Sequence, residues 1–114
     1  KLSMYTSSAT LGKSTTSYTS DNEVISPYGY SATGKALVSS TPVLSTDTAV
    51  CDFADLTFVG VSLTARGALI YNDSATGDPA VAVLDFGGDK TATSGTFTIQ
   101  FPTANASDAI LRIA

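Results

Sequence analysis

Carboxylates are the side chains of this sequence best suited to chemistry, because it contains no histidine. They fall beside two predicted turns in the second half of the chain and on either side of Phe53. The first group is Asp73, Asp78, Asp85 and Asp89, and the second is Asp52 and Asp55. A calcium ion accepts such oxygens, but the spacing matches no EF-hand loop. Because aspartate is strongly favoured in turns, we expect these residues to form turns and solvate the surface.

Catalytic motifs are missing from the sequence. Without histidine the commonest general base is absent, and Ser-His-Asp and Cys-His arrangements are excluded. No serine lies in a Gly-x-Ser-x-Gly or Ser-x-x-Lys motif, and Asp89 follows Gly87-Gly88, where it would repel phosphate. A glycosidase needs two facing carboxyls, and no tryptophan is present to stack a sugar. We expect no enzyme, no catalytic residue, no cofactor and no metal; a small hydrolase using Asp85 or Asp89 is the enzymatic alternative.

Composition predicts one domain with few charges. A chain of 114 residues can hold one modest core, and its charged share of 14% is low, with Ser and Thr filling the gap. The net charge of −4 and the scattered Lys and Arg argue against a nucleic-acid partner. No apolar run is long enough for a membrane span and no leader is visible, so no membrane partner is expected. The single cysteine, Cys51, is expected to be a small buried core residue.

The elements that would position these residues are strands. Thr96–Phe101 alternates strictly, with Phe97, Ile99 and Phe101 on one face, and predicts a half-buried antiparallel strand. Turn-forming residues separate the β-rich runs at intervals of about 8 to 12 residues, which is typical of an all-β sandwich or barrel. The predicted runs are Arg66–Tyr71, Pro79–Phe86, Gly95–Phe101 and Ala109–Ile113, and the predicted turns are Asn72–Asp78 and Gly87–Asp89.

Four further features of the strands are predicted. Pro79–Phe86 is almost continuously apolar, which favours a central strand with both faces covered. Asp85 inside it should face solvent or pair with Arg66 or Arg112. Leu56–Leu63 changes phase at Gly60, which indicates a bulge or bend. Shorter strand candidates are Lys35–Val38 and Pro42–Leu44.

The first 34 residues are rich in hydroxyl side chains and carry few large apolar groups. We expect a pair of edge strands and loops stabilised by the C-terminal sheet, or alternatively an extended arm that finishes folding on a partner. Tyrosine offers apolar area and a hydrogen bond together, which suits an interface. The candidate partner-contact residues are therefore Tyr5, Tyr18, Tyr28 and Tyr30. The predicted fold is a single all-β domain of residues 1–114, an antiparallel β-sandwich or jelly-roll-like core at 35–114 with the segment 1–34 attached.

The C-terminal half resembles small proteins of about this length that are encoded by tailed bacteriophages. The resemblance lies in an alanine-aliphatic-tyrosine-asparagine strand, an aliphatic-aspartate-phenylalanine-glycine strand and a threonine-phenylalanine-threonine-isoleucine strand. It covers a little under half of the chain and is a signature of fold, so it assigns no site residue. The matching runs are Arg66–Pro79, Val83–Asp89, Ser94–Phe101 and Ile110–Ile113.

The resemblance implies a component of the virion on or near the capsid. The leading hypothesis is a non-enzymatic decoration or cement protein that binds the major capsid protein and clamps neighbouring copies, as a homo-oligomer such as a trimer on the capsid surface. The alternative is a receptor- or glycan-binding module of a fibre or spike, or a head-tail accessory module. Missing tryptophan weakens the glycan-binding version.

Overall fold

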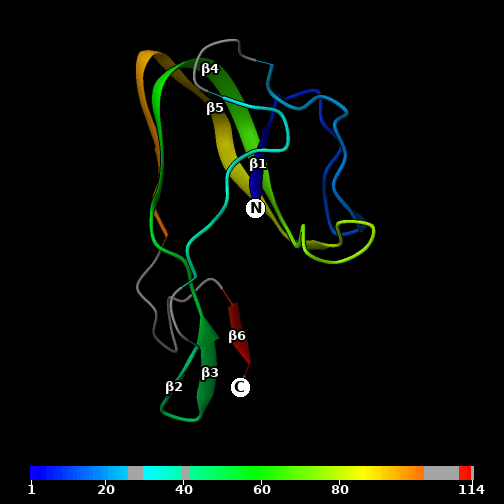
Figure 1. Ribbon diagram of the computed structural model, residues 1–114, viewed down its shortest axis with the longest axis vertical. Helices are drawn as coiled ribbons and strands as arrows, with labels where there is room; N and C mark the ends of the chain where they lie inside the picture. Colours follow the sequence, from blue (N-terminus) through cyan, green and yellow to red (C-terminus); the bar gives the residue numbers. More distant parts are fainter. Residues whose placement is uncertain (26–29, 40–41, 102–110, 114) are drawn as a thin grey trace. The chain divides into compact units, whose positions relative to one another are not determined.

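A computed structural model of the chain describes residues 1–25, 30–39, 42–101 and 111–113. Within these ranges the regular structure consists of six β-strands and no helix, so the all-β class is confirmed for them. No described helix could cross a membrane. The chain divides into two compact units (Figure 1). Unit 1 comprises Lys1–Ala36 and Phe58–Phe97, and unit 2 comprises Leu37–Thr57 and Thr98–Ala114.

Unit 1 is built on a three-stranded sheet in the order β1-β4-β5 (Figure 1). Strand β1 is antiparallel to the end of β4, with Leu2 opposite Ile70 and Tyr5 opposite Gly67. Lys1 extends this pairing, since its backbone N–H donates to Tyr71 O at 2.9 Å and its carbonyl accepts from Tyr71 N at 3.0 Å. The strand bounds are Leu2–Tyr5 for β1, Leu56–Tyr71 for β4 and Ala80–Ile99 for β5.

The core of unit 1 lies around β1 and the end of β4. All four residues of β1 and the last four of β4 are buried. Side chains alternate along a strand, so Tyr5, Leu69 and Tyr71 share one face, where the segment containing Leu11 and Tyr18 packs against them. Burying one Leu, Met or Ile side chain contributes about 1.5–3 kcal/mol. The hydroxyl-rich N-terminal segment therefore supplies central core residues through β1.

Strand β4 contains the predicted irregularity at Gly60. Leu56, Phe58, Val61 and Leu63 are buried, whereas the two residues at the phase change, Val59 and Gly60, are exposed. Gly60 has φ = 67°, a left-handed conformation that an L side chain rarely adopts. The bulge or bend at Gly60 is confirmed, and the residues on both sides of it belong to one strand, β4.

The link between β4 and β5 is the predicted hairpin loop. Asn72 Oδ1 accepts hydrogen bonds from Ser74 N at 3.1 Å and from Ser74 Oγ at 2.6 Å, which is an Asx-type turn. Asn72 N donates to Pro79 O at 2.9 Å and closes the loop. Gly77 and Asp78 both take positive φ.

The second predicted turn, Gly87–Asp89, is wrong. Strand β5 continues through it from Ala80 to Ile99, with Gly87 at φ = 79°. Two glycines at this point allow the local distortion without breaking the strand. Within the same strand the alternation of Phe97 and Ile99 inside against Thr96 and Thr98 outside is confirmed.

The expectation of a central strand at Pro79–Phe86 is also wrong. In the described sheet β4 is central and β5 is an outer strand. Val81 is 47% exposed, and no residue of Ala80–Phe86 is fully buried. An apolar run without clear alternation does not distinguish a covered strand from a half-exposed edge, because both accept alanine and valine.

Unit 2 contains a smaller antiparallel sheet in the order β2-β3-β6. Its strands are Val43–Ser45, Thr48–Cys51 and Leu111–Ile113. The predicted strand at Pro42–Leu44 appears as β2, whereas Lys35–Val38 forms no strand and only Lys35 makes an isolated bridge, to Leu2. Cys51 is a free thiol that is only partly buried, so the expected full burial is wrong.

Candidate functional site

The most constrained polar group of unit 1 is Glu23, the single glutamate of the sequence. Its side chain is 6% exposed. One carboxylate oxygen accepts a hydrogen bond from Tyr18 Oη at 2.5 Å, and the other accepts from Tyr30 Oη at 2.6 Å and from Thr33 N at 2.9 Å. Three donors compensate for the loss of water around a buried carboxylate. The group formed by Glu23, Tyr18, Tyr30 and Thr33 is called the Glu23 cluster below.

The Glu23 cluster is held against the outer edge of β1. Val24 N donates to Met4 O at 2.9 Å, and Tyr30 Oη accepts from Met4 N at 2.9 Å. Leu2 exchanges two backbone hydrogen bonds with Lys35, at 2.8 and 3.0 Å. The outward-facing backbone groups of Leu2 and Met4 are therefore all bonded within the chain. This edge of the sheet is closed.

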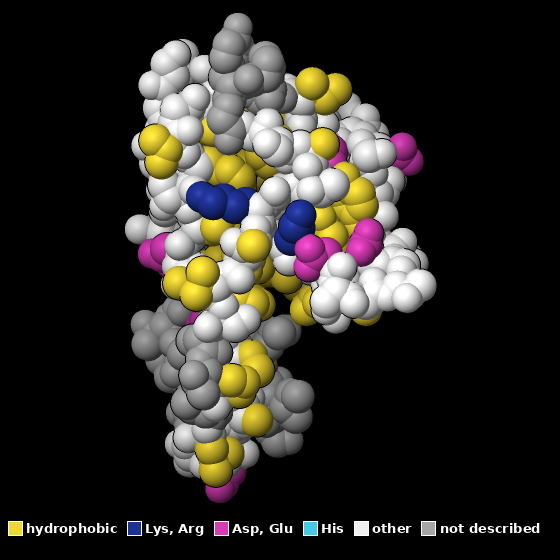
Figure 2. Space-filling model, viewed as in Figure 1, with side chains coloured by type: hydrophobic (Ala, Val, Ile, Leu, Met, Phe, Trp, Pro, Cys, Tyr) yellow, Lys and Arg dark blue, Asp and Glu magenta, His cyan; other side chains and the backbone are white. Residues whose placement is uncertain are grey.

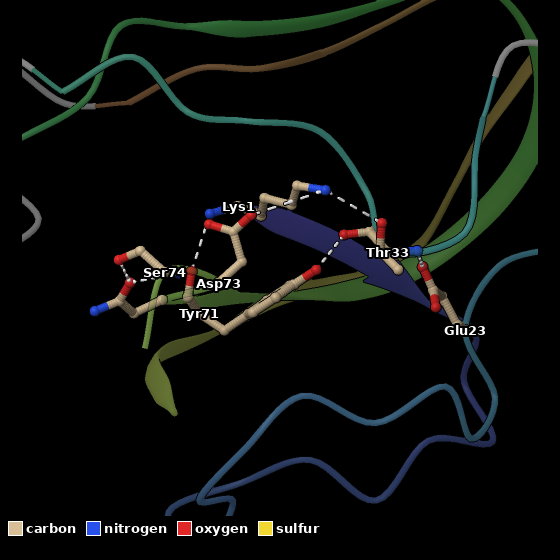
Figure 3. A network of polar contacts seen from close by, with 7 residues as sticks. Lys1, Glu23, Thr33, Tyr71, Asp73 and Ser74 are labelled. Atoms are coloured by element: carbon tan, nitrogen blue, oxygen red, sulfur yellow. Dashed lines mark hydrogen bonds and ion pairs between the residues drawn. The ribbon is translucent and has the colours of Figure 1, made fainter. Parts of the chain in front are cut away.

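Tyr71 links the cluster to the hairpin loop (Figure 3). Its hydroxyl donates to Thr33 O at 2.5 Å, on the residue whose N–H reaches Glu23. Lys1 Nζ lies 3.4 Å from Thr33 Oγ1 and 3.9 Å from Asp73 Oδ2. The Tyr18 and Tyr71 rings pack with their centroids 4.8 Å apart. The polar contacts in this region tie residues 18–25 and 30–33 to β1 and β4, which is a structural role.

Burial raises the pKa of all four described tyrosines above the ordinary value, and the buried Glu23 charge adds to this effect. For Tyr18 and Tyr30 the hydrogen bonds to Glu23 raise it further, because they favour the protonated hydroxyl. The residues concerned are Tyr5, Tyr18, Tyr30 and Tyr71.

We expect the raised pKa values of these tyrosines to affect the free energy of unfolding only at alkaline pH. A raised pKa in the folded state gives stabilisation that is complete below the unfolded value of 10.0 and is lost as the pH rises from there through the folded pKa. Tyrosinate absorbance and unfolding should therefore rise together above about pH 10. The measurements are ultraviolet absorbance and circular dichroism on one alkaline titration. Full tyrosinate formation near pH 10 with the fold intact would contradict this.

The structure distributes the candidate partner-contact tyrosines unequally. Tyr5 is 1% exposed and Tyr30 is 5% exposed, so neither side chain is accessible to a partner in this fold. Tyr5 Oη donates to Thr19 O at 2.7 Å. Tyr18 is partly buried and bonded to Glu23. Tyr28 lies outside the described residues. A partner-contact role for Tyr18 and Tyr28 remains a prediction.

Asp85 faces solvent and is paired with Arg66, as the sequence predicts. Its Oδ1 accepts from Arg66 Nε at 3.2 Å and from Gly87 N at 2.8 Å. Both groups are exposed, so the pair contributes little to stability. The Gly87 hydrogen bond, followed by the Arg66 guanidinium, lowers the pKa of Asp85 below its ordinary value. The side chain of Arg112 is outside the description.

The pKa of Asp85 should depend only partly on Arg66. In Arg66→Ala we expect the titration midpoint of Asp85 to move up but to stay below 3.8, since the Gly87 hydrogen bond is the larger cause and remains. The stabilising effect of a lowered pKa is present above the unfolded value and disappears as the pH falls through the folded one. NMR titration of the side-chain carboxyl measures the midpoint, and Lys90→Ala on the same strand serves as the control. An unchanged midpoint in Arg66→Ala would contradict the assignment.

The other predicted carboxylates do not converge. Asp73 and Asp78 lie in the hairpin loop, and Asp89 is exposed on β5. Asp52 Oδ1 accepts from Phe53 N and Asp55 Oδ1 from Phe101 N, each at 2.8 Å. In the described part of the chain, no three acidic, cysteine or histidine side chains are grouped to hold a metal ion. These contacts are typical of turn and loop stabilisation.

Two neighbouring cavities lie between the segment 6–15 and strands β4 and β5 of unit 1. The first, of about 280 Å³, is lined by Tyr5, Gly67 and Arg66 among others, and so lies over the face of the sheet. The second, of about 460 Å³, lies between residues of 11–15 and Ala80–Val83 with Asp85. Leu11, Val83 and Asp85 belong to both. This is the concave surface that a partner could fill.

Sequence reasoning missed the Glu23 cluster. One signal was available: the sequence has nine aspartates but a single glutamate, and three tyrosines lie near that glutamate in the sequence. No local rule predicts that Thr33, ten residues away, donates a hydrogen bond to it. It also missed Gly34, which has φ = 83° and lies against the backbone of Leu2.

Comparisons of the chain with known protein families, with curated proteins and with solved structures found no match.

Proposed function

We propose that this chain is a non-enzymatic structural protein of a phage virion, a capsid decoration or cement protein that binds the major capsid protein and neighbouring copies of itself. The resemblance of Arg66–Ile113 to small phage proteins motivates the proposal. The finer fold class, an antiparallel β-sandwich or jelly-roll-like domain, is part of it, and the three-stranded antiparallel sheet of unit 1 supports that class.

The observation that carries the proposal is the contrast between the buried Glu23 carboxylate, whose three donors all come from within the chain, and a concave, weakly charged exterior. The carboxylate of Glu23 accepts hydrogen bonds from Tyr18, Tyr30 and Thr33, and these contacts are structural. Figure 2 shows few charged side chains on this face, where hydrophobic side chains lie among backbone and side chains of other types. Such a surface suits many weak contacts repeated on a symmetric lattice, where effective concentration supplies the affinity.

The test is binding to capsids of the phage that encodes the chain, prepared without this protein. The purified chain should sediment with them and saturate at a stoichiometry that matches a local symmetry axis of the shell. The same capsids already carrying the native protein are the matched control and should bind little more. No binding over a range of salt concentrations would contradict the proposal. Selective binding to host cells or glycans would favour the fibre or spike alternative.

A further inference from the structure

At the start of β5, residues 16–18 pair with the outer edge of the strand, and the residues before them turn away from it and leave a fork between the two segments. Ser17 forms an antiparallel bridge with Pro79, with Tyr18 N donating to Asp78 O and Ala80 N donating to Thr16 O, both at 2.9 Å. If this pairing continued, Thr15 would lie opposite Val81 and Leu11 opposite Asp85. Instead the chain turns away, because Thr15 N donates to Gly12 O at 3.0 Å and Thr15 Oγ1 accepts from Gly12 N at 2.9 Å.

The cavity of about 460 Å³ fills the space between the two arms of this fork. Its lining includes Ala80, Val81, Ala82 and Val83 in succession. Successive residues point to opposite faces of a sheet, so a cavity that touches all of them lies along the edge of the strand. The space between the segment 11–15 and Ala80–Asp85 is called the edge slot below.

Backbone groups of β5 face this slot. Asn72 N bonds to Pro79 O on the side of β4, whereas Asp78 O and Ala80 N bond on the opposite side. The same alternation turns the N–H and C=O of Ala82 outward. Between Val81 and Leu84 no backbone hydrogen bond joins β5 to any described residue outside the sheet. The β1 edge is closed by the chain itself, so the two edges of one sheet differ.

We propose that the edge slot accepts an extended segment of the capsid subunit, which adds to β5 as a strand. This rests on the proposed function and names its contact. An unpaired strand edge is recognised by another extended backbone, with side-chain pockets adding specificity. The slot walls are apolar or hydroxyl-bearing at Leu11, Thr15, Val81 and Val83, with one charge of each sign at Lys13 and Asp85. The segment that fits therefore carries mainly small apolar or hydroxyl side chains.

A second copy of this chain fits the slot less well than a free segment. Its own β5 edge is flanked by its own residues 11–15, and a symmetric pairing would bring both flanking segments into the same space. A free extended segment of another protein has no such flank. Each copy also carries a net charge of −4, which opposes close pairing of two identical edges.

The test compares capsid binding by slot variants and a matched control. Val81→Lys places a charge at the slot, and Ala82→Pro removes the outward N–H while sparing the bonds to β4. Val59→Lys is the control, because it makes the same change at an exposed valine of β4 that lies outside the slot. Val59 is 72% exposed. We expect about tenfold or greater loss of affinity for both slot variants and no loss for the control. Melting curves show whether each variant is folded.

Amide exchange on the wild-type chain is the second readout. Binding to capsids should slow exchange at Ala82, and its neighbours on β5 report the length of the added strand. If the wild type binds capsids but the slot variants bind equally well and Ala82 is not protected, the slot inference is overturned and the proposed function survives. If the wild type does not bind, both fail. Loss of self-association in Val81→Lys with unchanged capsid binding would assign the slot to a second copy and would also overturn the inference.

Discussion

Glu23→Ala should destabilise the fold by about 3–5 kcal/mol. The substitution removes the acceptor of Tyr18 Oη, Tyr30 Oη and Thr33 N, and the Tyr30 hydroxyl is buried where water cannot easily replace it. A domain of this size has a free energy of unfolding of about 5–15 kcal/mol, so the loss is a large share of it. The expected drop in melting temperature is about 15 °C or more, measured by circular dichroism and by urea unfolding.

Two companion variants make the result specific. Glu23→Gln keeps the size and one acceptor oxygen, so an intermediate loss of about 1–3 kcal/mol is expected. Asp21→Ala removes an exposed carboxylate two positions away and should change stability by less than about 0.5 kcal/mol. Equal effects of Glu23→Ala and Asp21→Ala would show that the Glu23 cluster does not hold this region together.

Gly34→Ala should be at least as damaging, for a steric reason. An added Cβ would lie 1.9 Å from Leu2 O and 2.8 Å from Ser3 Cα, both backbone atoms of β1. Neither atom can move without breaking the bonds between Leu2 and Lys35 that close this edge. We expect a loss above about 4 kcal/mol, or failure to accumulate as folded protein. Urea unfolding and soluble yield measure this.

Gly77→Ala is the matched control for that effect. Both glycines have φ = 83°, so alanine would introduce the same backbone strain at either position. No atom lies within 4 Å of a Cβ built on Gly77. Its substitution should therefore cost only about 1–2 kcal/mol. If the two variants lost equal stability, conformational strain alone would explain Gly34 and its contact with β1 would be unimportant.

The sequence predicts the strands where side chains alternate or turn residues are unambiguous. Alternation at Phe97 and Ile99, the phase change at Gly60 and the Asx turn at Asn72 are local signals, and all three are present in the structure. Pairing order is not a local property. The apolar run in β5 therefore suggested a central strand, whereas in the sheet β4 is central and β5 is an outer strand.

The candidate site is less predictable, because its contacts join distant segments. The ion pair between Arg66 and Asp85 could be anticipated, since a charge inside an apolar strand needs solvent or a partner. The Glu23 cluster could not, because it depends on Tyr30 and Thr33 folding back over β1. Two of the tyrosines expected at a surface became interior hydrogen-bonding groups for the same reason. The edge slot likewise depends on the turn at Gly12–Thr15 that separates two segments far apart in sequence.

Electron cryomicroscopy of the intact particle tests the central proposal most directly. The proposal predicts density for this chain on the outer surface of the capsid, in contact with the major capsid protein, and repeated around a local symmetry axis of the shell. Density confined to the tail, neck or fibres, or a particle in which the chain is absent from the capsid, would contradict it.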